Sequence, residues 1–275
     1  MEVIKSKLFL GVEKPFTFLQ TSDTHFCLTD EEEPEHRRAF ARDRRQGFPH
    51  AEENAAFIRQ YVAKTGYPII HTGDLMDFIT PENLRVCRDL VRDTGMMVVA
   101  GNHEQAHCVN NVFCPEDYAW DMARREDTFT QIQPWFENDL QFTCRRIGGV
   151  NFVGIDNGNY QISRAQLDAL KAVAEQGKPI LLFMHIPLYS KELQAMHHDC
   201  YLAPPKEVLA TYTPWQVYEQ KADEQTLEAC VYIRGEPLIQ YVICGHLHFN
   251  HETQAPGEIR QIVTGLDTLR EITVV

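Results

Sequence analysis

Small sets of Asp, Asn and His residues follow five separate apolar runs of this sequence. Each run has the length and the apolar, β-branched character of a buried strand. The runs and the residues that follow them are Phe16–Gln20 with Asp23 and His25, Pro68–His71 with Asp74 and Asp77, Met96–Ala100 with Asn102 and His103, Pro179–Met184 with His185, and Leu238–Cys244 with His246 and His248. Ligands bind at the carboxyl ends of strands in open α/β sheets, so we expect these side chains to converge on one site.

Seven of these residues have oxygen or nitrogen donors that bind divalent cations, and none is a thiolate. This donor set suits Mn²⁺, Fe²⁺, Zn²⁺, Co²⁺ or Ni²⁺ better than a cysteine-bound structural zinc. Seven ligands exceed the number that one four-coordinate zinc uses. If Asp74 bridges, the set can hold two cations about 4 Å apart, which suits an in-line displacement. The expected metal ligands are Asp23, His25, Asp74, Asn102, His185, His246 and His248.

The elements that must position these residues indicate an α/β fold. Thr80-Pro81 is typical of an N-cap followed by proline at the first helical position, and Ser163 with Gln166 forms a capping box. The expected helices cover residues 54–64, 80–92 and 163–175, and further strands are expected at 150–155 and on both sides of Gly265. Helices therefore alternate with the apolar runs along the chain.

We expect a single domain over residues 1–275, with three insertions. Residues 28–50, 110–141 and 188–224 fall outside the alternation of helices and strands. Long excursions inside a compact domain commonly serve as lids or binding loops. Because each follows one of the metal-binding motifs, we expect the three insertions to form the walls or cap of the pocket.

The order of the motifs resembles the signature of the calcineurin-like metallophosphoesterases. The matching elements are Asp-x-His at Asp23, Gly-Asp-x-x-Asp at Gly73, Gly-Asn-His-Glu at Gly101, a histidine at His185, and Gly-His-x-His at Gly245. They span most of the chain. The resemblance implies a four-layer α/β/β/α sandwich with two mixed sheets packed face to face. It also implies hydrolysis of a small-molecule phosphate ester, a phosphomonoester or phosphodiester, by a hydroxide that bridges two metals.

The resemblance further implies a role for each motif residue. One cation would be held by Asp23, His25, Asp74 and His248. The other would be held by Asp74, Asn102, His185 and His246. His103 would protonate the leaving oxygen as a general acid, and Asp77 would hydrogen-bond His103 and fix its tautomer.

Each element alone also has an ordinary structural explanation. Gly73-Asp74 and Gly101-Asn102 could be strand-ending turns, and His185 could be a hydrogen-bonded core histidine. Because all five elements occur together in family order, we favour the metal site. For the other histidines we favour structural or surface roles. His71 is expected to be a structural partner. His107 could also approach the site, and His197 and His198 could also reach the substrate.

Five arginines lie in the first insertion, at Arg37, Arg38, Arg42, Arg44 and Arg45. Arginine makes bidentate contacts with phosphate, so this cluster could bind a substrate phosphoryl group. The arginines alternate with acidic residues, however, and we therefore expect a solvated helix face.

Competing functions are constrained by missing motifs. The sequence lacks Cys-x5-Arg, Asp-x-Asp-x-Thr, a P-loop and Gly-x-Ser-x-Gly. Asp77 occupies the position at which purple acid phosphatases carry a tyrosine ligand, which argues against that branch. The enzymatic alternative is a DNA or nucleotide phosphodiesterase of the nuclease branch. A non-catalytic metal-binding scaffold is the alternative from another class, and the retention of His103 argues against it.

Composition and charge bound the partners. The formal charge of −13 makes nucleic acid an unexpected partner, because broad binding needs Lys and Arg to neutralise phosphates. No apolar run approaches about 18 residues, so we expect no membrane span. The first residues lack the pattern of a signal peptide, which favours a cytoplasmic location. Eight cysteines without Cys-x-x-Cys predict free thiols. No feature of the sequence specifies an oligomeric state.

Overall fold

The computed structural model describes residues 1–106, 122–188, 190, 192–193, 223–253 and 259–275. Two mixed β-sheets pack face to face within this part of the chain. In order of hydrogen-bonded neighbours, the first sheet contains β1 (Glu2–Leu8), β11 (Thr268–Val274), β2 (Phe16–Thr21), β3 (Ile69–His71) and β4 (Met97–Val98). The second contains β5 (Phe142–Ile147), β6 (Val150–Ile155), β7 (Ile180–Phe183), β8 (Ile239–Cys244), β10 (Arg260–Val263) and β9 (His251–Glu252).

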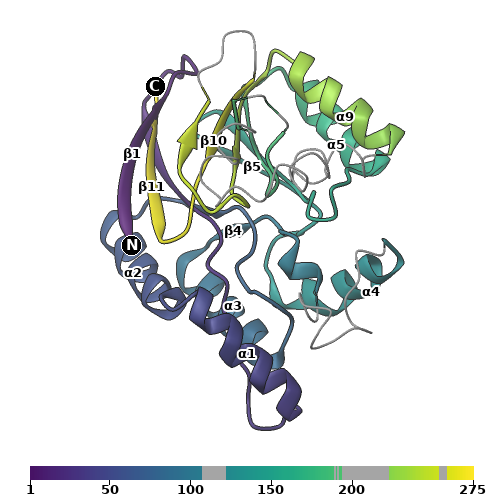
Figure 1. The fold of residues 1–275 in the computed structure, drawn as a ribbon. Coiled ribbons are helices and arrows are strands. Elements are labelled where there is room, and N and C mark those ends of the chain that lie inside the picture. Colours follow the sequence, from purple (N-terminus) through teal and green to yellow (C-terminus); the bar gives the residue numbers. More distant parts are fainter. Residues whose placement is uncertain (107–121, 189, 191, 194–222, 254–258) are drawn as a thin grey trace.

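Helices cover the two outer faces. The apolar side chains of α2 (Ala51–Thr65) and α3 (Pro81–Thr94) share a core with the first sheet. Those of α5 (Arg164–Ala174) and α9 (Glu224–Gly235) share a core with the second. Figure 1 shows the two helix pairs on opposite sides of the molecule. The four-layer α/β/β/α sandwich expected from the resemblance is confirmed.

A third core lies between the sheets and fixes their separation. Phe18, Phe152 and Phe183 meet there from three different strands, and all are fully buried. The Phe18 and Phe152 ring centroids lie 4.9 Å apart in an edge-to-face contact, and those of Phe152 and Phe183 lie 5.3 Å apart. Such pairs contribute about 0.5–1.5 kcal/mol beyond their buried area. Because β2 and β7 carry two of these rings, the contact sets the relative position of two loops that bear polar motifs.

The capping signals act as expected. The Thr80 side chain accepts a hydrogen bond from the backbone N–H of Asn83 and begins α3. Ser163 and Gln166 form both hydrogen bonds of the capping box at α5. The strand of residues 96–100 is shorter than expected: β4 has two residues, and the Asn138 side chain pairs with both the N–H and the carbonyl of Val98.

The first insertion contains the helix on which the arginine cluster was expected: α1 (Glu35–Gly47) has 13 residues. Other elements lie where no regular structure was expected. The second insertion contains α4 (Met122–Ile132) and a short 3₁₀ helix, η2 (Gln133–Trp135). The edge strand β1 pairs in parallel with β11 along seven residues, joining the two ends of the described chain. Of the third insertion, residues 189, 191 and 194–222 lie outside the described residues.

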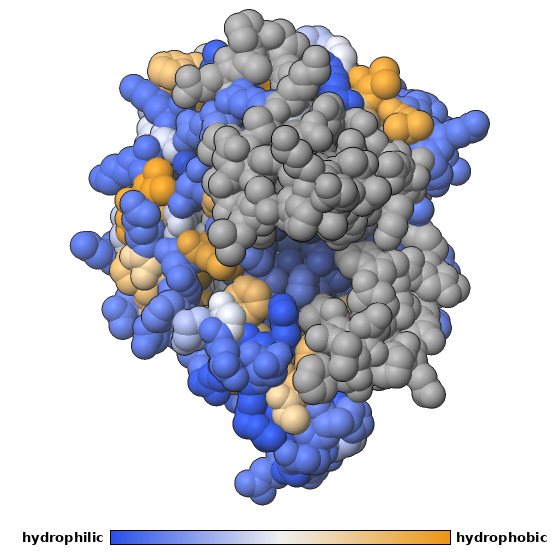
Figure 2. Space-filling view, in the orientation of Figure 1, coloured by the Kyte–Doolittle hydropathy of each residue, from blue (hydrophilic) through white to orange (hydrophobic). Residues whose placement is uncertain are grey.

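The visible surface is mainly hydrophilic. Figure 2 shows apolar side chains in small separate patches among the described residues of this face. No helix in the described ranges is long and apolar enough to cross a bilayer. The cysteines that the structure describes are free thiols: Cys27, Cys87, Cys144, Cys230 and Cys244.

The aromatic contact between the sheets yields a stability prediction. Phe152→Ala should lower the free energy of unfolding by about 3–5 kcal/mol, because it leaves a cavity between the sheets. Urea unfolding followed by circular dichroism measures this. Phe9→Ala is the matched control, because Phe9 is 62% exposed, and it should change stability by less than about 0.5 kcal/mol. Equal effects of the two substitutions would contradict the assigned core.

Candidate metal centre

The loops after β2, β3 and β8 hold unusual backbone conformations. Five of the seven expected ligands have φ between 51° and 69°: Asp23, His25, Asp74, His246 and His248. Non-glycine residues adopt this left-handed region uncommonly, and such residues concentrate at functional sites. The loops support one another through backbone hydrogen bonds. The N–H of Asp23 donates to Gly73, that of His25 to Asp74, and that of Gly245 to His185.

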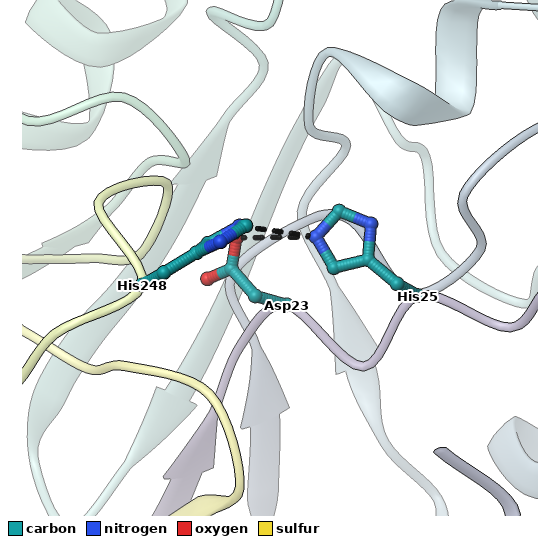
Figure 3. Close-up of side chains that lie close together, drawn as sticks. All are labelled: Asp23, His25 and His248. Carbon is teal, nitrogen blue, oxygen red and sulfur yellow. Dashed lines mark hydrogen bonds and ion pairs between the residues drawn. The ribbon is translucent and has the colours of Figure 1, made fainter. Parts of the chain in front are cut away.

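Asp23, His25 and His248 form one cluster of possible metal ligands. Figure 3 shows the carboxylate of Asp23 and the two imidazoles pointing toward one another from the loops after β2 and β8. His248 Nε2 lies 3.2 Å from His25 Nε2 and 3.4 Å from Asp23 Oδ1. These atoms come from positions 225 residues apart in the chain, so the packed sheets alone bring them together.

Asp74, His185 and His246 form a second cluster, and the side chain of Asn102 joins it. His185 Nε2 lies 3.0 Å from Asp74 Oδ2 and 3.1 Å from Asn102 Oδ1. His246 Nδ1 also lies 3.1 Å from Asn102 Oδ1. The structure therefore brings all seven expected ligands into two adjacent clusters.

Asp74 lies where the clusters meet. Its Oδ2 atom is 3.0 Å from His185 Nε2 in one cluster and 3.7 Å from His25 Nε2 in the other. Of the seven residues, Asp74 thus has the position that a bridging ligand requires.

The donor chemistry fits cations. His185 Nδ1 is 2.7 Å from the Thr72 carbonyl, to which it donates its proton. In the neutral imidazole, the Nε2 lone pair then faces the acceptor oxygens of Asp74 and Asn102. Convergent acceptors of this kind are satisfied by a metal ion or by added protons. Burial lowers the pKa of His185, but the Asp74 carboxylate outweighs burial and raises it to about 9. Cations and protons therefore compete for the same positions.

The Glu104 side chain stabilises the turn that carries Asp74. Its buried carboxylate accepts hydrogen bonds from four backbone N–H groups, those of Asp74, Leu75, Met76 and Gly101, at 2.6–3.1 Å. Position 101 must be glycine, because a Cβ atom there would lie only 2.2 Å from Asp74 Oδ1. The Gly-Asn-His-Glu motif therefore shapes the loop that carries Asp74 as well as its own residues.

His103 lies in η1 (His103–Gln105), beside the clusters. Its Nδ1 atom is 2.8 Å from the Asp77 carbonyl and 3.0 Å from Asp77 Oδ1, and its Nε2 atom is 3.9 Å from Asp74 Oδ2. Burial lowers the pKa of His103, but Asp74 and Asp77 outweigh burial, so the net pKa is raised. By distance, His103 could also complete a ligand group with His25 and Asp74.

Two supporting residues were not expected from the sequence. Asn157 accepts hydrogen bonds from the N–H groups of His185 and Ile186, and donates to the Ile186 carbonyl. Asp156 accepts hydrogen bonds from the Gln105 side chain and from the Gly158 backbone. The signal was present, because Asp-Asn-Gly-Asn follows the apolar run 150–155 in the same way as the five recognised sets.

The other sequence expectations have mixed outcomes. His71 is a structural partner, with Nε2 2.9 Å from Thr24 Oγ1. The expectation of a solvated face was wrong for Arg44, which pairs with the buried carboxylate of Asp77. It was also wrong for Arg37, whose side chain is 13% exposed and donates to the Ile79 carbonyl. Arg42 does lie at the surface, paired with Glu35. His107, His197 and His198 lie outside the described residues.

Comparison with known proteins agrees with this geometry. The family model of calcineurin-like phosphoesterases matches residues 16–250. This span is most of the chain, and the protein therefore belongs to that family. A comparison with curated protein sequences found no match.

Similar solved structures include two phosphatases and a hydrolase. A dimetal phosphatase from Danio rerio is 13% identical, with a TM-score of 0.52 over 91% of this chain and 87% of that chain. A phosphopantetheinyl hydrolase from Mycobacterium tuberculosis is 16% identical, with a TM-score of 0.46 over 90% and 89%. A purple acid phosphatase from yellow lupin seeds is 12% identical, with a TM-score of 0.47 over 94% and 44%. At these identities the likeness shows the fold alone.

The Glu104 contacts yield a prediction about the Asp74 turn. Glu104→Gln places an N–H₂ group against backbone N–H donors, so we expect unfolding to become easier by on the order of 2–4 kcal/mol. Urea unfolding and titration with Mn²⁺ should show reduced stability and weaker metal binding together. The exposed Glu126 provides the control substitution to Gln. A Glu104→Gln protein with wild-type stability and metal affinity would refute this role.

Proposed function

We propose that this protein is a dinuclear-metal phosphoesterase that hydrolyses a small phosphomonoester or phosphodiester. The observation that carries the proposal is the position of the Asp74 carboxylate between two ligand clusters, in a chain of the calcineurin-like phosphoesterase family. The residues that would hold the two divalent cations are Asp23, His25, Asp74, Asn102, His185, His246 and His248.

The protein's own residues would contribute to the hydrolysis by positioning the reacting groups and by transferring a proton. When bound, two divalent cations lower the pKa of a coordinated water and stabilise charge on the attacking and leaving oxygens. The clusters converge from loops of both sheets, so the sandwich holds the ligands at fixed separation. Pre-organised charge of this kind costs no reorganisation during the reaction.

His103 is the proposed general acid. Its Nδ1 proton is held between the carbonyl and the carboxylate of Asp77, which leaves Nε2 directed toward Asp74 Oδ2. The neighbouring carboxylates outweigh burial and raise the pKa of this imidazole, so they favour the protonated form that can donate to a leaving alkoxide. Asp77 is proposed to fix the tautomer of His103.

Substrate class is proposed from charge and chemistry. The net charge of −13 favours a small ester over a nucleic acid, so the nuclease-type phosphodiesterase is the weaker alternative. The presence of His103 and of every ligand disfavours the non-catalytic scaffold. A cytoplasmic location, pocket walls formed by the three insertions, and Mn²⁺, Fe²⁺, Zn²⁺, Co²⁺ or Ni²⁺ as the cations are also part of the proposal.

The function is tested first with chromogenic esters. Chelator-stripped protein should hydrolyse p-nitrophenyl phosphate or bis-p-nitrophenyl phosphate only after a divalent cation such as Mn²⁺ is restored. The preferred ester separates a monoesterase from a diesterase. Two bound ions with no turnover of either ester under any divalent cation would favour the scaffold and overturn the proposal.

Substitution of His103 tests its assigned role. His103→Ala should lower kcat by about 10²–10⁴-fold while two cations remain bound, because a general acid is lost and no ligand is removed. Turnover and metal stoichiometry by elemental analysis measure the two effects. His50, half-exposed at 55%, is the control for substitution to Ala. Equal loss of metal and turnover would instead place His103 among the ligands.

A further inference from the structure

The last turn of α1 reaches the candidate active site. Arg44 makes a two-pronged ion pair with Asp77: Nε donates to Oδ2 at 2.6 Å and Nη2 donates to Oδ1 at 2.8 Å. The side chain of Asp77 is fully buried, whereas that of Arg44 is 29% exposed. The family-signature motifs contain no residue of α1, so this contact is a property of the insertion in this chain.

The same carboxylate orients two histidines. Asp77 Oδ1 lies 2.9 Å from His25 Nδ1 and 3.0 Å from His103 Nδ1. An ionised carboxylate only accepts, so His25 Nδ1 donates to Oδ1, whereas His103 Nδ1 donates to the Asp77 carbonyl at 2.8 Å and forms an ion pair with Oδ1. The two Nε2 atoms lie 3.7 and 3.9 Å from Asp74 Oδ2. One oxygen of Asp77 therefore holds the Nδ1 proton of a candidate ligand and lies beside that of the candidate general acid.

A ring contact reinforces this arrangement. The Arg44 guanidinium lies over the Phe48 ring, 5.2 Å from its centroid. Phe48 in turn stacks on His25, with centroids 3.9 Å apart and an interplanar angle of 12°. His25 is thus held at its edge by Asp77 and on its face by Phe48, and Arg44 contacts both of the residues that hold it.

We propose that Arg44 is a positioning residue, which locks the Asp77 carboxylate so that Oδ1 accepts the Nδ1 proton of His25 and stays paired with the His103 imidazole. The proposal deepens the proposed function, on which its catalytic part rests. Without the guanidinium, the carboxylate can rotate and offer its oxygens separately to the two rings. A planar fork is required, because an ammonium donates from a single point and cannot fix the carboxylate plane.

A purely structural role is the competing explanation. Arg44 would then only anchor α1, and its loss would lower stability without changing the histidines. The two explanations differ in the hydrogen bond of the His25 Nδ1 proton, in metal affinity and in kcat. Outer contacts to metal-ligating histidines typically change metal affinity or activity by about 10–100-fold, which is a measurable range.

The experiment compares Arg44→Ala and Arg44→Lys with the control Arg42→Ala. Arg42 lies on the same helix, is 64% exposed and pairs only at the surface with Glu35. We expect Arg44→Ala to weaken Mn²⁺ binding and to lower kcat, each by about 10–100-fold, with KM nearly unchanged. Added guanidinium ion below denaturing concentrations should restore part of kcat, and Arg44→Lys should restore little.

The readout that needs no catalysis is the Nδ1 proton of His25, which is present in both the neutral and the charged ring held by Asp77. Proton NMR spectra of the metal-free protein should show it as a downfield, slowly exchanging signal in the wild type and in Arg42→Ala. In Arg44→Ala the signal should move upfield and exchange faster with water. An unchanged signal, metal affinity and kcat in folded Arg44→Ala would overturn the proposal. If that variant does not fold, wild-type values in Arg44→Lys would overturn it instead.

These measurements distinguish failure of the proposed function from failure of the positioning role of Arg44. If the wild-type protein hydrolyses no ester, the proposed function fails, while the His25 Nδ1 proton signal and the Mn²⁺ affinity still decide the role of Arg44. If the wild type is active and the Arg44 variants match it in every measure, the function stands and the positioning role falls.

Discussion

Burial of the Asp74 carboxylate is the constraint on which the rest of the site depends. The residue is 1% exposed, and an ionised carboxylate without compensating charge is strongly disfavoured in such surroundings. Positive charge must therefore stand beside it, either as protons on His185 and His25 or as cations between the same atoms. Burial lowers the pKa values of these histidines, but nearby carboxylates outweigh burial and raise them to about 9 and about 10. The scaffold is built to hold positive charge at this point.

The loops carry a conformational cost for this geometry. Five candidate ligands have left-handed backbones, and each such residue costs on the order of 1–3 kcal/mol. The sum is comparable with the whole stability of a typical domain, about 5–15 kcal/mol. Hydrogen bonds between the loops, the Glu104 carboxylate and the aromatic core between the sheets offset it. The packing of the sandwich therefore stabilises the strained conformations of the loops.

Local patterns in the sequence predicted much of this structure, and tertiary pairing supplied the remainder. Polar sets after apolar runs predicted where candidate ligands such as Asp23 and His185 would gather, because strand ends in a sheet share an edge. The four-layer architecture came from the resemblance, since periodicity cannot choose between sheet packings. The pairing of Asn138 with Val98, and of β1 with β11, depends on register between distant segments. Arg44 and Arg42 share one charge-rich helix, and nothing in their spacing distinguishes the residue that turns inward.

The Asp77 carboxylate contacts both a candidate metal ligand, His25, and the candidate general acid, His103. It is buried and lies between Arg44 on one side and the imidazoles of His25 and His103 on the other. Burial raises the pKa of Asp77, but these neighbours outweigh burial and hold it well below its usual range, so the carboxylate stays an acceptor. A rotation of this one group would disturb a candidate ligand and the candidate acid together. The proposed metal binding and proton delivery would thus be coupled through a contact that the insertion, outside the family motifs, supplies.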